Sequence, residues 1–174
     1  SVVRLIKTLV LWKKPAPAGF FVLGSNPIVQ RVDWVIPFTD RELQKAWREN
    51  QRAAKVETRT NAHRLLLFYS VECGLKAVLL KRQSKDCTDS CRELLEVRHD
   101  INKLLDKLAA GEKLKLPSQL SMKPLKNNQE RELSCAEINQ MWRYGGCCDN
   151  IKDNELEKKL LDILSWIAQE LQGL

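Results

Sequence analysis

The most constraining feature of this 174-residue sequence is residues 61–82, NAHRLLLFYSVECGLKAVLLKR. Drawn as a helix, this segment carries apolar side chains on almost every side and has no wide polar face. Such a helix needs neighbours on most of its sides to keep those side chains from water. The sequence therefore predicts a buried central helix, which the rest of the chain has to cover.

The segments around the central helix show helical signals of their own. Capping boxes, in which a Ser or Thr hydroxyl and a Glu three residues later satisfy free backbone amides, stand at Thr39–Glu42 and Ser134–Glu137. Gly111 and the glycine pair at 145–146 favour helix ends. We therefore predict an all-α fold, an up-and-down bundle of four to five helices. Its covering helices are expected at residues 39–56, 99–110, 134–144 and 154–171, with a short helical segment at 92–97.

The remaining segments divide the chain into an arm and a domain. Residues 1–38 hold four prolines and only short amphipathic or extended pieces, so we expect an irregular N-terminal arm that packs on the domain or on a partner. Residues 39–174 form the helical domain, with a long, lysine-rich connector at 111–133 that is either functional or mobile. The apolar start of the chain is interrupted by Arg4 and Lys7 and is too short to cross a bilayer. We expect a cytoplasmic protein with no membrane partner.

Positive charge is concentrated toward the N-terminal end. The formal net charge is +7, and residues 1–60 hold 11 basic and 5 acidic side chains. Six of these cations follow one another at spacings of three and four residues, which places them on one side of a helix that continues to residue 59. Such a ridge attracts a phosphate backbone, although a solvated charged face produces the same pattern. The predicted nucleic-acid-binding residues are Arg41, Lys45, Arg48, Arg52, Lys55 and Arg59.

Glu72 is the one acidic residue of the central helix. A carboxylate among apolar side chains needs a partner or carries a raised pKa. Arg98, His99 and Arg143 are the candidate partners, and a buried ion pair is favoured over a catalytic base. Arg143 and Tyr144 stand at a helix end, where the helix dipole favours a cation. We therefore interpret Glu72, Arg143 and Tyr144 as structural polar partners.

The six cysteines allow two interpretations. Cys73 lies inside the central helix and is typical of a buried thiol. Cys87 and Cys91, followed by His99, could supply three zinc ligands, with Cys147 or Cys148 as the fourth, but their spacing is not that of a regular zinc finger. Free thiols in a reducing compartment are the simpler interpretation. We expect neither a metal site nor a cofactor.

The order of these pieces resembles the HEPN (higher eukaryote and prokaryote nucleotide-binding) superfamily over residues 40–172. The buried helix YSVECGLKAVLL, the helix start RHDINKLLDKL and the segment WRYGG before a last amphipathic helix carry the resemblance. It implies a helical bundle that is often a homodimer. It also implies a module that binds RNA, a nucleotide or a protein partner such as a nucleotidyltransferase-like antitoxin, within a bacterial defence or toxin–antitoxin system. The matching positions are Glu72, His99, Asp100, Arg143 and Tyr144.

The resemblance also implies an alternative function, because many members are metal-independent endoribonucleases that use an arginine and a histidine a few residues apart. Arg92 and His99, with six residues between them, fit that spacing, and Arg98 adds a second cation. His99 would move the proton of an RNA 2′-hydroxyl, and the arginines would hold the phosphate. No histidine follows Arg143, where the pair usually lies in this family. The binding module is therefore the first expectation, and a toxin-like endoribonuclease is the alternative.

Overall fold

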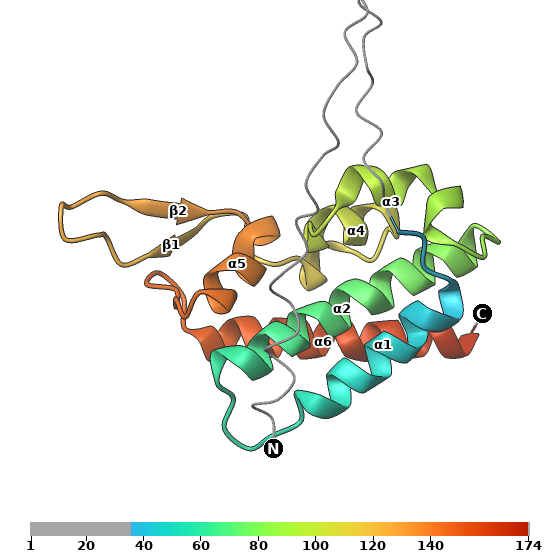
Figure 1. The fold of residues 1–174 in the computed structure, drawn as a ribbon, viewed down its shortest axis with the longest axis horizontal. Coiled ribbons are helices and arrows are strands. Elements are labelled where there is room, and N and C mark those ends of the chain that lie inside the picture. Colours follow the sequence, from blue (N-terminus) through green and yellow to red (C-terminus); the bar gives the residue numbers. More distant parts are fainter. Residues whose placement is uncertain (1–35, 174) are drawn as a thin grey trace, which may run out of the picture. The chain divides into compact units, whose positions relative to one another are not determined.

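The computed structural model describes residues 36–173, so the N-terminal arm predicted for residues 1–38 lies outside the described residues except for its last three. Within the described part, three helices are long: α1 (Asp40–Ala53), α2 (Asn61–Arg82) and α6 (Asp153–Gly173). Three are short: α3 (Arg92–Val97), α4 (Ile101–Lys107) and α5 (Ile138–Arg143) (Figure 1). The prediction of an all-α fold is confirmed.

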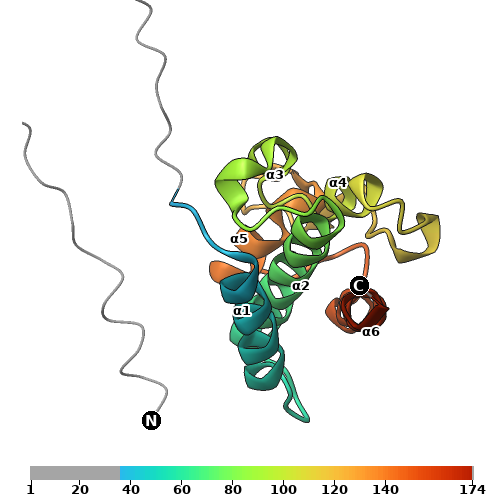
Figure 2. The same cartoon turned by 90° about the vertical axis from the view of Figure 1, so that its right-hand side faces the viewer.

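Helix α2 is the centre of the bundle, as its sequence predicts. It contacts α1, α6, α5 and α4, and it lies between α1 and α6 in the view of Figure 2. Gly74 shows how close these neighbours are. A Cβ atom at this position would lie 2.9 Å from two side-chain carbons of Ile167 on α6 and 3.2 Å from the Trp47 ring on α1. The missing side chain therefore allows two helices to pack against the same turn of α2.

Helix α1 begins at the predicted capping box. The Glu42 amide donates to Thr39 Oγ1 at 3.3 Å, and the Thr39 amide donates to Glu42 Oε2 at 2.8 Å. The predicted continuation of this helix to residue 56 is wrong, because the helix ends at Ala53. Ala54 is buried, and its carbonyl accepts a hydrogen bond from Arg59 Nε at 2.9 Å, which turns the chain back toward α2.

The loop after α2 leads through a 3-10 turn (Thr88–Ser90) into α3 and α4. Arg98 joins α3 to α4 with a φ of 49°, an uncommon conformation for a residue with a side chain. Asp100 then caps α4, since its Oδ1 accepts from the Lys103 amide at 3.0 Å. The apolar side chains of α4, including Ile101, Leu104 and Leu105, are buried in the core.

The lysine-rich connector is structured in part. After a 3-10 turn (Glu112–Leu114) it forms a small antiparallel hairpin of β1 (Leu120–Met122) and β2 (Arg131–Leu133). Leu120 pairs with Leu133, and Met122 pairs with Arg131. Figure 1 shows the hairpin extending beside α5. The hairpin therefore supplies one wall of a cavity against α5.

The last two helices, α5 and α6, form where the sequence predicts them, but a 3-10 turn precedes α5. The capping box of Ser134 and Glu137 is present, but it opens a 3-10 turn (Cys135–Glu137) before α5 begins. Helix α6 buries a stripe of Leu156, Leu160, Ile163, Leu164 and Ile167. Among residues 36–173, no helix combines the length and the apolar character that crossing a bilayer requires.

Candidate nucleic-acid interface

The end of α1 at Ala53 divides the predicted row of cations. Arg41, Lys45, Arg48 and Arg52 lie on the helix, and all four are exposed. Lys55 and Arg59 lie in the turn after it, so the expectation that all six share one helix face is wrong. The last four of the row nevertheless come together around one hollow of the surface, and they do so because the chain turns after Ala53.

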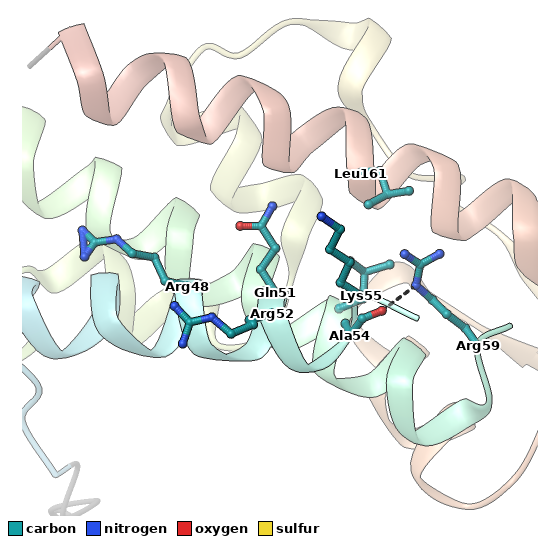
Figure 3. Close-up of a pocket in the computed structure, with 8 residues that line it drawn as sticks. Arg48, Gln51, Arg52, Ala54, Lys55, Arg59 and Leu161 are labelled. Atoms are coloured by element: carbon teal, nitrogen blue, oxygen red, sulfur yellow. Dashed lines mark hydrogen bonds between the residues drawn. The ribbon is translucent and has the colours of Figure 1, made fainter. Parts of the chain in front are cut away.

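This hollow, the α1–α6 pocket, has a volume of about 570 Å³. Arg48, Arg52, Lys55 and Arg59 line it together with Gln51 (Figure 3). Its apolar surface comes from three different elements: the C-cap of α1, the central helix and α6. The residues are Ala54, Leu67 and Leu161, and Leu161 faces the pocket from α6 across from Lys55 (Figure 3). The pocket thus combines an apolar base with a cationic rim.

Among residues 36–173, Arg59 is the one cation of this rim that pairs with an acid. Its guanidinium donates to Glu157 Oε2 at 3.1 Å, and both side chains are largely buried. Glu157 also accepts from Arg64 Nε at 2.7 Å, and Arg64 lies 3.4 Å from Asp153. This network joins the start of α2 to α6. Arg59 therefore forms part of the pocket wall, and its charge is largely balanced by Glu157.

The other cations of the rim keep their charge available. Arg48 donates to the neutral Gln44 Oε1 at 2.7 Å, and its guanidinium stands 5.6 Å from the centre of the Trp47 ring. In residues 36–173, neither Arg48, Arg52 nor Lys55 forms an ion pair with a carboxylate. Several positive charges over a low-dielectric base produce a field that favours an anion. The arrangement can hold phosphate groups through charge-assisted hydrogen bonds.

The first two cations of the row differ from each other. Lys45 lies 4.0 Å from Glu49, and both side chains are exposed, so water and salt screen this pair. Arg41 forms no ion pair within the described residues. Both lie on α1 beyond the pocket, so the exposed positive surface continues along the helix from the rim.

Glu72 is bound by one of its three candidate partners. His99 Nδ1 lies 3.0 and 3.1 Å from the two carboxylate oxygens, and Lys76 Nζ donates to Oε1 at 2.6 Å. Burial alone would raise the pKa of the Glu72 carboxyl, but the hydrogen bond from His99 and the charge of Lys76 together lower this pKa below its ordinary value. Lys76 stands one helical turn after Glu72, so helical spacing alone could have identified it.

Arg143 and Tyr144 do not join Glu72. The Arg143 guanidinium donates to the Tyr69 hydroxyl instead. This contact holds the end of α5 to α2, so Arg143 links two helices without a carboxylate. Tyr144, the next residue, is 80% exposed and lines a second cavity between the hairpin and α5.

The three candidate catalytic residues differ in their surroundings. Arg92 is 90% exposed in its side chain and lies 3.6 Å from Glu96, so it pairs within α3. The Arg98 side chain is exposed and forms no ion pair with residues 36–173. His99 has a half-exposed ring whose Nδ1 is held by Glu72. None of the three lines the α1–α6 pocket.

The described cysteines are free thiols. Burial raises the pKa of the Cys73, Cys135 and Cys148 thiols to about 11, so these thiols stay protonated near neutral pH. Within residues 36–173, no three His, Cys, Asp or Glu side chains gather in a way that could hold a metal ion.

The fold and the pocket define a helical protein with a cation-rimmed, apolar-based hollow between two helices that flank a buried third. No family model matches the chain, and neither a curated protein nor a solved structure matches it.

Proposed function

We propose that residues 40–172 form a HEPN-like helical module that binds RNA through the α1–α6 pocket. One observation carries the proposal: Arg48, Arg52 and Lys55 line a single pocket, and no carboxylate in residues 36–173 neutralises them. RNA presents a continuous series of phosphates, and cations without acidic partners release its counterions on binding.

The length of the cationic surface favours a polymer over a single nucleotide. Arg41 and Arg52 are eleven residues apart on α1, which corresponds to about 17 Å along the helix axis. A mononucleotide placed in the pocket would leave Arg41 and Lys45 without a phosphate. A strand that runs along α1 would meet both and enter the pocket. The role of such a module in a bacterial defence or toxin–antitoxin system stays a prediction from the resemblance.

Competition binding tests this proposal. A fluorescein-labelled RNA oligonucleotide is titrated with the protein, and its fluorescence anisotropy is followed at several salt concentrations. We expect saturable binding that weakens as salt rises and that unlabelled RNA reverses, while a mononucleotide and a poly-glutamate peptide compete poorly. Equal competition by the acidic peptide would favour a protein partner. Absence of RNA binding at low salt would refute the proposal.

A second candidate, a metal-independent endoribonuclease, rests on the Glu72–His99 contact. Because a carboxylate only accepts, His99 Nδ1 carries a proton toward Glu72, and Nε2 lies on the opposite side of a half-exposed ring. In this candidate Nε2 takes the proton of a 2′-hydroxyl. The 2′-oxygen then bonds to phosphorus while the bond between phosphorus and the 5′-oxygen breaks, and the leaving 5′-oxygen takes up a proton from water. The neighbouring Arg98 would stabilise the charge on the phosphorane.

Incubation of the protein with RNA in the presence of EDTA tests this second candidate. We expect cleavage that His99→Ala abolishes and that His63→Ala, which removes the only other histidine of the sequence, retains. If the protein binds RNA without cleaving it, the enzyme is refuted and the binding module remains.

A further inference from the structure

The second cavity, which we call the hairpin cavity, lies on another part of the surface. It has a volume of about 510 Å³ and is open to solvent between the β1–β2 hairpin, the end of α5 and the turn that follows α5. Met122 and Leu133 come from the hairpin, and Met141 comes from α5. Gly146 completes this wall. A Cβ there would lie 2.3 Å from the Met122 terminal methyl group, so a side chain at this position would push into the hairpin.

Tyr144 stands at this cavity with its ring almost free. Its exposure of 80% is the highest among the large apolar side chains exposed in residues 36–173, and it lies next to a surface of methionine and leucine. Covering an exposed aromatic ring with a ligand removes its apolar surface from water, which is favourable. Planar aromatic ligands stack on such rings, and thioether sulfurs make favourable contacts with aromatic groups.

The polar groups of the cavity are suited to a base that carries a phosphate. Arg131 Nε donates to the Lys123 carbonyl at 2.8 Å, which holds the guanidinium at the cavity wall. Lys123 is exposed, and the Gln140 side-chain amide forms no hydrogen bond with the described residues. The one carboxylate of the lining, Glu137, already accepts from the Ser134 amide at 2.9 Å. Cations for a phosphate and an amide for a base edge thus remain available.

The hairpin cavity is close to the α1–α6 pocket along the chain. Arg59 lines the pocket, and two residues later Asn61 Nδ2 donates to the Gly146 carbonyl at 2.7 Å, at the lining of the cavity. Two consecutive peptide units join Arg59 to Asn61, so the Cα atoms of these two residues are at most about 7.6 Å apart. A flexible strand held at the pocket is therefore near the cavity. The bases of an A-form duplex stay stacked inside the helix and cannot leave it to enter a cavity without unpairing.

We infer that the hairpin cavity accepts one unpaired nucleobase, stacked on Tyr144, of a single-stranded RNA whose backbone lies in the α1–α6 pocket. The inference rests on the proposed RNA binding and adds the class of RNA that the module selects. Stacking on an aromatic ring tolerates any base, because every base has a π-face. The module is thus specific for unpaired RNA without reading its sequence.

Substitution of Tyr144 tests the inference by anisotropy titration with a labelled single-stranded RNA. Tyr144→Ala is expected to weaken binding roughly 5- to 150-fold, the range that corresponds to losing one base–aromatic stack. The salt dependence stays unchanged, because no phosphate contact is removed. Tyr144→Trp retains a stacking ring and is expected to bind like the wild type. Leu95→Ala, at an exposed apolar residue that does not line the cavity, is the matched control.

The outcomes separate the two proposals. If Tyr144→Ala binds as tightly as the wild type while loss of the pocket cations weakens binding, the inference is overturned and the RNA-binding proposal stands. If the wild-type protein prefers a duplex of the same sequence, the inference is likewise overturned. If the wild-type protein binds neither form, RNA binding itself is refuted, and the inference fails with it.

Discussion

Removing the three available cations of the α1–α6 pocket is the sharpest perturbation that the structure offers. The variant Arg48→Gln/Arg52→Gln/Lys55→Gln eliminates three positive charges that have no acidic partner among residues 36–173. Glutamine keeps much of each aliphatic stem and is a good helix former. Because these side chains are exposed, we expect the fold to survive, with a circular dichroism spectrum like that of the wild type.

The magnitude follows from counterion release. Each phosphate contact on a single strand contributes about 0.7 to the slope of log K against log salt concentration, so three contacts contribute about 2. If this electrostatic contribution vanishes near 1 M salt, the same three contacts are worth about 50-fold in affinity at physiological ionic strength. The triple variant should therefore bind RNA about 50-fold more weakly, and its salt slope should be shallower by about 2.

The assay compares salt slopes between variants of equal net charge. The control, Lys85→Gln/Lys103→Gln/Lys107→Gln, also removes three exposed cations, and none of them lines the pocket. We expect the control to keep the wild-type slope within the small change that the overall charge produces. Anisotropy titrations at four or more salt concentrations measure both variants in parallel.

Two results would refute this reasoning. An unchanged slope in the pocket variant would mean that its cations are only a solvated face of the protein. An equal decrease in both variants would mean that RNA responds to the overall charge, and that the pocket has no special part.

Three further predictions concern stability and are measured by urea denaturation. Glu157→Ala leaves two partly buried arginines without a carboxylate and should cost about 3 kcal/mol, whereas the exposed neighbour Glu155→Ala should cost less than about 1 kcal/mol. The native state lowers the pKa of Glu72, so its ionised carboxylate adds stability that is complete above its ordinary pKa of 4.5 and is lost as the pH falls through the lowered pKa. Glu72→Gln should therefore remove this loss of stability at acidic pH. A Glu72→Gln variant that loses as much stability in acid as the wild type would contradict the assignment. Phe68→Ala should cost about 3–5 kcal/mol because the ring is fully buried in α2, and a loss below about 1 kcal/mol would show that α2 is not the centre of the core.

The fold was predictable where local chemistry decides it. The all-round apolar character of residues 61–82 predicted the buried α2, and the capping boxes predicted where α1 and the α5 region begin. The end of α1 was missed because no glycine or proline marks it. The chain turns there because Ala54 is buried and Arg59 binds its carbonyl, which are tertiary contacts. The hairpin was missed because its strands have three residues each, too few for an alternating pattern to be recognised.

The candidate site shows a similar limit. The sequence identified the cations of the row, because charge and spacing are visible in a single segment. It did not identify Leu161 on the far side of the pocket or Glu157 beneath Arg59. Glu157 is 98 residues from Arg59 in sequence, and no periodicity connects residues that far apart. For Glu72 the sequence left three partners open, and only the packing of α4 against α2 selects His99.

The different surroundings of the six cations explain how one sequence pattern yields two roles. Arg59 is largely buried and forms an ion pair with Glu157, so its role is to link the turn after α1 to α6. Arg48, Arg52 and Lys55 face solvent at the rim, where a charge without a partner costs little and remains free to meet a phosphate. The anchored arginine holds the turn that brings Lys55 to the rim. The pocket therefore uses the ion-paired Arg59 as structure and leaves three cations free to bind phosphate. For this reason the slope of log K against log salt concentration should reflect three phosphate contacts.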